Sequence, residues 1–263
     1  MDVFRLRHGA APLVVSMPHV GTHLPEDIAG RMTPVERTVP DTDWHLERLY
    51  DFLDELGATV FVATHSRYVV DLNRPEDDAS LYPGQDTTGL LPIDTFAREP
   101  LYAGAVPDAN ERAARVRRYW RPYHDALAAT LADLRERHGA VLLWDAHSIK
   151  SEVPRFFAGR LTDLNLGTAS GASCDARIER ALADVARESA GYTHVMNGRF
   201  KGGYITRRYG RPADGVHAVQ LELSEATYMN EAPPFDFRDD IAARVRPVLR
   251  RLLTAALETL RTF

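Results

Sequence analysis

Cysteine, long apolar runs and an excess of one charge are all lacking in this chain of 263 residues. The single thiol, Cys174, excludes an internal disulfide framework and is typical of a reducing compartment. No apolar run approaches the length of a membrane span, and the N-terminal MDVFRLRHG has no secretory signal core. With 32 Lys and Arg against 37 Asp and Glu, the net charge of −5 favours neither a nucleic-acid nor a membrane partner. We therefore expect a soluble cytoplasmic protein, whose oligomeric state the sequence leaves open.

Apolar runs alternate with helical periodicities along the chain, whose hydrophobic content of 44% suffices for a full core. Strands are expected in the runs PLVVSM, TVFVAT, AVLLWDAHS and HAVQLELS, with SRYVVDLN extending the second of them. Helices are expected over residues 43–56, over 110–138 with a bend at Pro122, after a cap at Ser173, and within 235–260. Because no linker or repeat interrupts this alternation, it predicts one three-layer α/β domain over residues 1–263.

Two histidines follow apolar strand runs, His19 in SMPH and His147 in DAHS. A neutral imidazole at the end of a strand is a common zinc ligand, although a hydrogen-bonded structural histidine is the alternative for each. Asp145 lies two residues before His147. It is expected either to orient an imidazole as a supporting carboxylate or simply to cap the loop.

A catalytic zinc site needs a third protein ligand and an open position. The sequence offers Asp43 in VPDTDWH and His23, four residues after His19. Asp43 has a rival interpretation as a helix N-cap, and His23 as a loop histidine. We prefer Asp43, because one carboxylate and two imidazoles leave Zn²⁺ with a net positive charge that polarises water and carbonyl groups. Manganese, iron or cobalt fits the same ligands.

The segment HSRYVVDLNR supplies Arg67, Asn73 and Arg74, which suit the binding of an anionic substrate. Arginine offers a planar fork to a carboxylate, and asparagine adds a directional hydrogen bond. A turn after Leu72 is required to bring Arg67 near Arg74, and surface ion pairs are the alternative interpretation.

Glu222 lies between leucines in an apolar strand, where a carboxylate is costly to bury unless it is paired or lies at a site. It is therefore the candidate general base, and Glu225 is a weaker one. The glycine-rich segment 197–212 carries positive charge and is expected to close over a small dianion, unless it is a solvated hairpin. Its basic residues are Arg199, Lys201, Arg207 and Arg208.

With these residues identified, the chain resembles the N-formylglutamate amidohydrolases over nearly its whole length. The resemblance rests on SMPHVGTHLP, PDTDWH, HSRYVVDLNRP, WDAHSIKSEVPRFF, DLNLGT, GRFKGGYITRRYG and VQLELSEATYM. It implies a zinc hydrolase with an α/β/α fold, a mixed central sheet and a relation to zinc carboxypeptidases. It also implies hydrolysis of N-formyl-L-glutamate to formate and L-glutamate, at the end of a bacterial route of histidine degradation.

The order of the motifs is also similar to that of zinc carboxypeptidases and aspartoacylases. By that pattern Arg67 polarises the carbonyl group, Asn73 and Arg74 hold the α-carboxylate, and Glu222 is the base. The basic loop, through Lys201 or Arg208, is expected to neutralise the side-chain carboxylate.

One position departs from that pattern. The carboxypeptidase relatives carry a glutamate three residues after the first histidine, where this chain has Thr22. The expected metal ligands are therefore His19, His147 and, by inference, Asp43, with His23 as the alternative. Two other functions stay open: a deacylase or carboxypeptidase acting on another N-acyl amino acid, and a metal-free protein that binds acidic metabolites.

Overall fold

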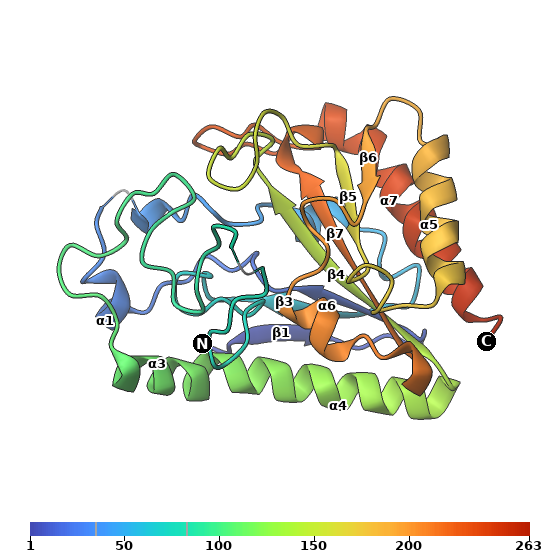
Figure 1. Ribbon diagram of the computed structural model, residues 1–263, viewed down its shortest axis with the longest axis horizontal. Coiled ribbons are helices and arrows are strands. Elements are labelled where there is room, and N and C mark those ends of the chain that lie inside the picture. The colour runs from blue at the N-terminus through green and yellow to red at the C-terminus, as the bar shows by residue number, and fades with distance from the viewer. Residues whose placement is uncertain (35, 83) are drawn as a thin grey trace.

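A mixed sheet runs through the molecule in the computed structural model, which describes residues 1–34, 36–82 and 84–263 (Figure 1). Its seven strands lie in the order β1 (Phe4–Arg7), β3 (Thr59–Ala63), β2 (Leu13–Met17), β4 (Val141–Ile149), β7 (Val216–Ser224), β5 (Leu164–Gly167) and β6 (His194–Met196). β1 is antiparallel to β3 and β5 is antiparallel to β7, whereas the other neighbours are parallel.

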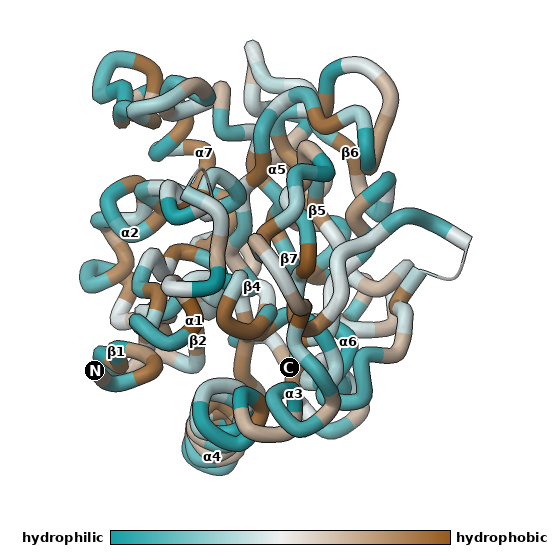
Figure 2. Tube along the Cα trace, turned by 90° about the vertical axis from the view of Figure 1, so that its left-hand side faces the viewer, coloured by the Kyte–Doolittle hydropathy of each residue, from teal (hydrophilic) through white to brown (hydrophobic). Residues whose placement is uncertain are grey.

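Helices cover both faces of this sheet. On one face lies a long helical segment made of α3 (Ala109–Arg115), a π-helical turn (Val116–Trp120) and α4 (Arg121–His138), and on the other lie α5 (Ala176–Glu188) and α7 (Asp239–Leu260). Figure 2, turned to look along α4, shows α4 and α7 on opposite sides of the strands. The short helical segments are α1 (Glu26–Ala29), α2 (Leu46–Leu49), α6 (Tyr204–Tyr209) and the 3₁₀ turns Glu36–Thr38, Pro212–Asp214 and Glu225–Thr227. The expected three-layer α/β fold with a mixed central sheet is confirmed.

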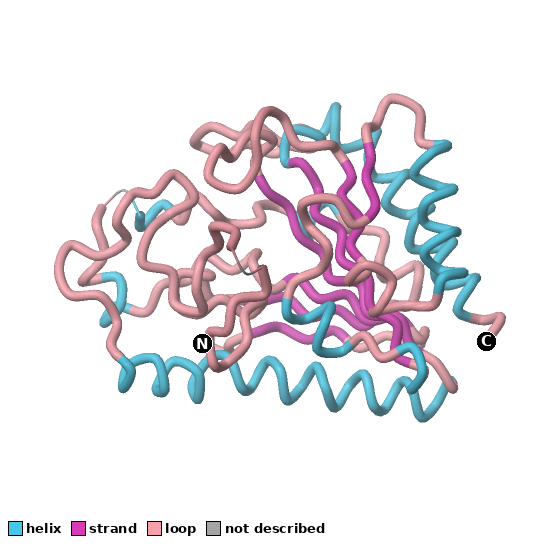
Figure 3. The backbone as a smooth tube through the Cα atoms, in the orientation of Figure 1, coloured by secondary structure: helices cyan, strands magenta, loops and turns pink. Residues whose placement is uncertain are grey.

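The face of β4 and β7 that is directed toward α4 changes from apolar to polar along the strands. Leu142 and Trp144 belong to the core shared with α7, whereas Val141 and Leu143 belong to the core shared with α4. Because side chains alternate across a strand, Asp145 and the following odd-numbered residues of β4 continue the α4-side face. That face is apolar at its beginning and polar at its carboxyl end. There it is covered by loops rather than by α4, and Figure 3 shows these loops gathered at that end of the sheet.

The helix expected over residues 43–56 is wrong in extent, since only α2 (Leu46–Leu49) and a series of turns form there. The backbone N–H of Asp43 donates to the His19 carbonyl oxygen, and His45 has a left-handed φ of 61°. A helix cannot start before His45 because these two features fix a different backbone path. Beyond Leu49 the apolar residue Leu53 is buried, as its spacing indicated, but the segment that carries it is not helical.

Two further local predictions are wrong. SRYVVDLN does not continue the strand, because turns close with hydrogen bonds from Val69 N to Ser66 O and from Arg74 N to Asp71 O. The second of these supplies the turn required beyond Leu72. Ser173 does not cap α5, since its hydroxyl donates to the Ala218 carbonyl; the Asp175 side chain caps α5 by accepting from the Arg177 backbone.

The long helix expected over residues 110–138 is present, and the bend expected at Pro122 stays a prediction. A π-helical turn ends at Trp120, two residues before Pro122, whose ring nitrogen has no hydrogen to donate. The single thiol, Cys174, is buried, and burial raises its pKa to about 12, which disfavours the reactive thiolate.

No helix among the described residues is long and apolar enough to cross a membrane.

His124 on α4 is expected to make the stability of the fold depend on pH. Its Nε2 donates to the Leu72 carbonyl oxygen, its Nδ1 contacts the Tyr209 hydroxyl, and burial lowers its pKa to about 3. Between that value and about 6.5 the unfolded chain binds a proton that the native chain excludes, so stability falls as pH falls. We expect this residue to account for about 2 kcal/mol of the stability lost between pH 7 and pH 5.

The measurement is the free energy of unfolding of the wild type and the His124→Gln variant in denaturant at both pH values. The wild type should lose more stability than the variant on acidification. His138→Gln, at an exposed position of the same helix, is the control and should behave as the wild type. Equal acid losses in the wild type and His124→Gln would contradict the assignment.

Candidate active site

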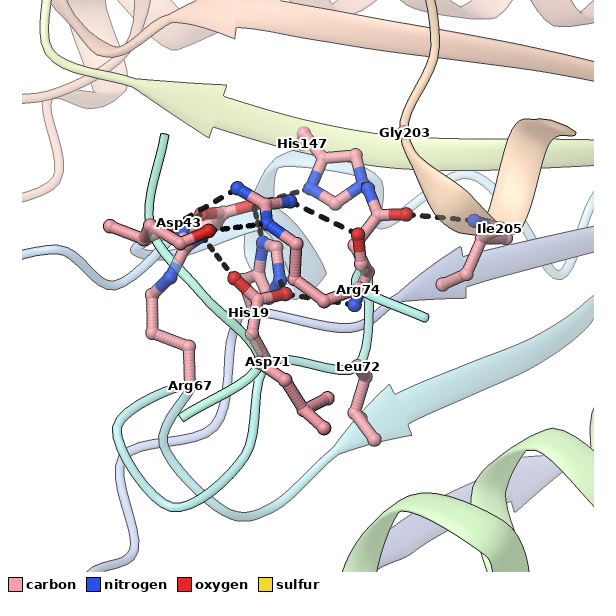
Figure 4. Close-up of polar contacts among 12 residues, drawn as sticks. His19, Asp43, Arg67, Asp71, Leu72, Arg74, His147, Gly203 and Ile205 are labelled. Carbon is pink, nitrogen blue, oxygen red and sulfur yellow. Dashed lines mark hydrogen bonds and ion pairs between the residues drawn. The ribbon is translucent and has the colours of Figure 1, made fainter. Parts of the chain in front are cut away.

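A cluster of two imidazoles and one carboxylate lies at the carboxyl ends of the parallel neighbours β2 and β4. His19 follows β2, His147 lies within β4, and Asp43 comes from the segment before α2. One potential ligand atom from each lies within 4.8 Å of the others, and all three residues are buried (Figure 4). The Asp43 Oδ2 atom is 3.1 Å from His147 Nδ1 and 3.8 Å from His19 Nδ1.

Two further carboxylates hold the far sides of these imidazoles. The Nε2 atom of His19 is 2.7 Å from Asp71 Oδ1, and that of His147 is 3.2 Å from Asp145 Oδ1. A carboxylate has no hydrogen to donate, so in the His19–Asp71 bond the Nε2 atom is the donor. Its Nδ1 lone pair is then directed toward Asp43, which is the arrangement that supporting carboxylates give to metal-binding histidines.

The charges around this cluster fit a bound cation. Burial opposes a charge on His147, yet Asp145 and Asp43 together raise its pKa well above the usual value. For His19, burial and the nearby Arg67 lower the pKa, which favours the neutral form that ligates metals. This buried corner therefore requires positive charge, which a divalent cation between imidazole nitrogens and a carboxylate would supply.

The structure separates the two candidates for the third ligand. Asp43 is not an N-cap: its Oδ2 atom accepts from the backbone N–H of Ser148 and contacts His147. His23 lies outside the cluster, with its ring 4.9 Å from that of His65 in an edge-to-face contact. Among the described residues the possible metal site is thus formed with Asp43.

Arg67 lies beside this cluster and is buried. Its Nη2 atom donates to Asp71 Oδ2 at 2.7 Å, and its Nη1 atom is 4.0 Å from Asp43 Oδ1. Its guanidinium carbon is 4.8 Å from the centre of the Phe96 ring, while its Nε–H has no hydrogen-bond partner among the described residues. The Arg67 side chain is therefore fixed in position, and it still has an N–H group that can donate a hydrogen bond at the site.

The Asn73 side chain connects the site to the basic loop. Its Oδ1 atom accepts from the Ile205 backbone at 2.8 Å, and its Nδ2 atom is 2.9 Å from His147 Nε2. A Cβ at Gly203 would lie 2.3 Å from Asn73 Nδ2, so this close approach requires glycine. Arg74 donates to the Thr88 carbonyl and hydroxyl oxygens and to the Asn73 carbonyl.

Glu222 faces the cluster from the adjacent strand, because the register of β4 and β7 places it opposite His147. Its carboxylate is buried and accepts from Gln220 Nε2 at 3.2 Å. Burial raises its pKa to about 8, with the Asp43 and Asp145 carboxylates adding to the shift while His147 and Arg67 oppose it. The sequence predicted a carboxylate of this strand at a site, and the side chain of Glu222 is buried beside the cluster.

Most of these groups line one pocket. Its walls comprise His19, Arg67, Asn73, Arg74, Tyr82, Thr87, Thr88, Phe96, His147, Ser148, Ile149, Phe156, Arg199, Phe200, Gly203, Gln220 and Glu222. Asp43 lies behind this surface, next to His147.

The two basic residues expected at the substrate do not line this pocket. Lys201 is exposed, and Arg208 lies on the solvent side of α6, whose buried face carries Ile205 and Tyr209. The basic residue of this loop that does line the pocket is Arg199. The structure therefore does not bring Lys201 and Arg208 to the pocket lining, and their expected role stays a prediction.

Sequence reasoning also missed Asp71, which binds both His19 and Arg67. A signal for it was present: like Glu222, it is a carboxylate within an apolar run, here VVDL. No comparable signal marks Phe96, because an aromatic residue in a long loop is common.

Comparisons with known proteins point to one family. Residues 11–229 match the family described as N-formylglutamate amidohydrolase. The chain is 50% identical over 256 residues to an N-formylglutamate deformylase of Pseudomonas putida, covering 97% of this chain and 96% of that one. It is 51% identical over 257 residues to the deformylase of the same name from Pseudomonas aeruginosa, with the same coverage.

Solved structures agree in fold. A crystal structure of an N-formylglutamate amidohydrolase from Ralstonia eutropha superposes with a TM-score of 0.85 at 28% identity over the full length of both chains. A gene product of Agrobacterium tumefaciens has the same fold, with a TM-score of 0.73 at 21% identity over 98% of this chain and 96% of that one.

Proposed function

Because the chain belongs to the N-formylglutamate amidohydrolase family, we propose that it hydrolyses N-formyl-L-glutamate to formate and L-glutamate. The observation that carries this proposal is the meeting of three potential metal ligands, a buried carboxylate and several arginines in one pocket. The names of relatives at about half identity over nearly the whole chain support the same substrate.

We propose that His19, Asp43 and His147 hold one divalent cation. Zinc is the metal that the family resemblance implies, and manganese, iron and cobalt suit the same ligands. When bound there, such a cation would polarise the formyl carbonyl group and lower the pKa of water. Support comes from the convergence of the ligand atoms and from the carboxylates that orient the imidazoles.

In the proposed reaction Glu222 acts as general base and then as general acid. It removes a proton from the attacking water and returns it to the departing amine nitrogen of glutamate. Burial and the neighbouring carboxylates raise its pKa to about 8, and a cation held at the proposed site would lower that pKa toward the ionised form that accepts a proton. Arg67, whose Nε–H has no hydrogen-bond partner in the part of the chain that the structure describes, stabilises the negative charge that develops on the formyl oxygen.

We assign the α-carboxylate of the substrate to Arg74, beside Asn73. Three guanidinium nitrogens of Arg74 already bind protein oxygens, which fixes its plane, and the N–H groups that remain can form a fork with a carboxylate. The amide of Asn73 is engaged with Ile205 and His147, so we propose that it positions the site as well as contacting substrate.

The test is formate release from N-formyl-L-glutamate by purified, metal-loaded protein, compared with acetate and succinate release from the N-acetyl and N-succinyl analogues. We expect the formyl compound to be preferred by a large factor. Preference for a larger acyl group would instead indicate a deacylase for another N-acyl amino acid. Tight binding of acidic amino acids without any hydrolysis would indicate a binding protein.

The remaining expectations stay predictions. We propose that residues 1–263 act as one catalytic domain in the cytoplasm, and that the reaction ends a route of histidine degradation. The two hydrophobic clusters on opposite faces of one sheet support the single domain. A strain that lacks the protein should accumulate N-formylglutamate when it is fed histidine.

A further inference from the structure

Arg74 and Arg199 differ from the other buried or half-buried arginines near the pocket, because neither forms an ion pair with a carboxylate of the described residues. The contrast is clear. Arg67 is paired with Asp71, and Arg155 with Asp86 and Asp94. The two unpaired guanidinium groups both line the pocket that contains Glu222.

Arg199 is held in place by neutral partners. Its Nε atom donates to the Phe156 carbonyl at 2.8 Å, and one terminal nitrogen donates to the Asp86 carbonyl at 3.3 Å. The rings of Tyr82 and Phe200 lie 5.5 and 5.4 Å from its guanidinium carbon. These contacts order the side chain without neutralising it, and its other terminal nitrogen has no hydrogen-bond partner among the described residues.

An ordered, partly desolvated positive charge without a counter-charge is costly, and a bound anion relieves that cost. Burial lowers the pKa of Arg199, as does the nearby positive charge of Arg74, whereas Tyr82, Glu222 and Asp86 oppose the shift; an arginine remains protonated at neutral pH. The pocket thus presents two positive charges that form no direct ion pair with a carboxylate of the described residues. Two charges match a substrate with two carboxylates rather than one.

We propose that Arg199 binds the side-chain carboxylate of the N-formyl amino acid and so makes the enzyme selective for acidic over neutral substrates. This inference rests on the proposed function and deepens it. It differs from the sequence expectation, which assigned this carboxylate to Lys201 or Arg208. Arg199 is not a participant in the bond-breaking step.

The experiment compares N-formyl-L-glutamate with N-formyl-L-glutamine, which replaces the side-chain carboxylate by an amide of the same shape. The wild-type holoenzyme and the Arg199→Gln and Arg199→Lys variants are measured with both substrates. We expect the wild type to prefer the acid by about 100-fold in kcat/KM, the effect of one charge-assisted interaction. Arg199→Gln should remove most of this preference by losing activity on the acid only, and Arg199→Lys should retain part of it.

Control variants identify the residue responsible. Arg211→Gln removes the same charge from the exposed end of the same basic segment and should keep the wild-type preference. A selective loss in Lys201→Gln or Arg208→Gln, with none in Arg199→Gln, would overturn the proposal. Equal losses on both substrates in Arg199→Gln would also overturn it, because they indicate a structural role.

The wild type alone provides a measurement that does not depend on the folding of a variant. Equal kcat/KM values for the two substrates would refute selection at Arg199 while leaving the hydrolase activity intact. No hydrolysis of either substrate by the metal-loaded protein would refute the proposed function itself.

Discussion

Replacing Glu222 by glutamine is expected to lower kcat for N-formyl-L-glutamate by about 1,000-fold and to change KM little. Glutamine keeps the shape and can still contact Gln220, but it cannot accept a proton from water. The loss should therefore appear in the chemical step rather than in substrate binding. Steady-state kinetics, with thermal unfolding to verify the fold, provide the measurement.

Glu225 offers a matched control, since it is buried in the same segment three residues further along. Burial raises its pKa well above the usual value, and the Asp43 and Glu231 carboxylates add to the shift, which favours its neutral form. Glu225→Gln keeps the shape of that form at a residue that does not line the pocket, so it should retain nearly full activity. Near-normal turnover by Glu222→Gln would rule out Glu222 as the base.

Loss of the metal is expected to have the second large effect. Dialysis against a strong chelator should reduce formate release to the background rate, and one equivalent of a divalent metal should restore it. Asp43→Ala should prevent this recovery and lower the bound metal measured by elemental analysis. The variant removes a buried carboxylate between His19 and His147, so its fold should be checked by circular dichroism.

His23→Ala is the corresponding control, because His23 was the alternative third ligand and lies outside the cluster. It should bind metal and recover activity as the wild type does. Full activity after complete removal of the metal would contradict the proposed metal centre, and loss of metal in His23→Ala would reassign the third ligand.

The sequence predicted the parts of the fold that depend on local patterns. Apolar runs located β2, β3, β4 and β7, and because parallel strands end at one edge, His19 and His147 were expected near each other. The helix over residues 43–56 was wrong in extent because a contact distant in sequence, from Asp43 N to the His19 carbonyl, decides the backbone there. Contacts between residues that are distant in sequence cannot be detected from the spacing of apolar residues.

The same limit applies to the site. The sequence favoured Asp43 over His23 as the third ligand only by a charge argument, and the folded loops separate the two by position. The basic loop offered several cations of similar character, and the direction in which each side chain points depends on where α6 begins and on the positive φ of Gly202. Asp71 shows the opposite case, in which a buried carboxylate in an apolar run was visible but was not assigned.

The register of β4 and β7 restricts how the length of this chain can vary. The pairing of His147 with Glu222 depends on every residue that precedes them in the two strands. An insertion or deletion of one residue within either strand would turn the side chains beyond it to the opposite face. Either the proposed metal ligand or the proposed base would then lie in the hydrocarbon layer beneath α7. Functional chains should therefore tolerate added or missing residues only in the connecting loops.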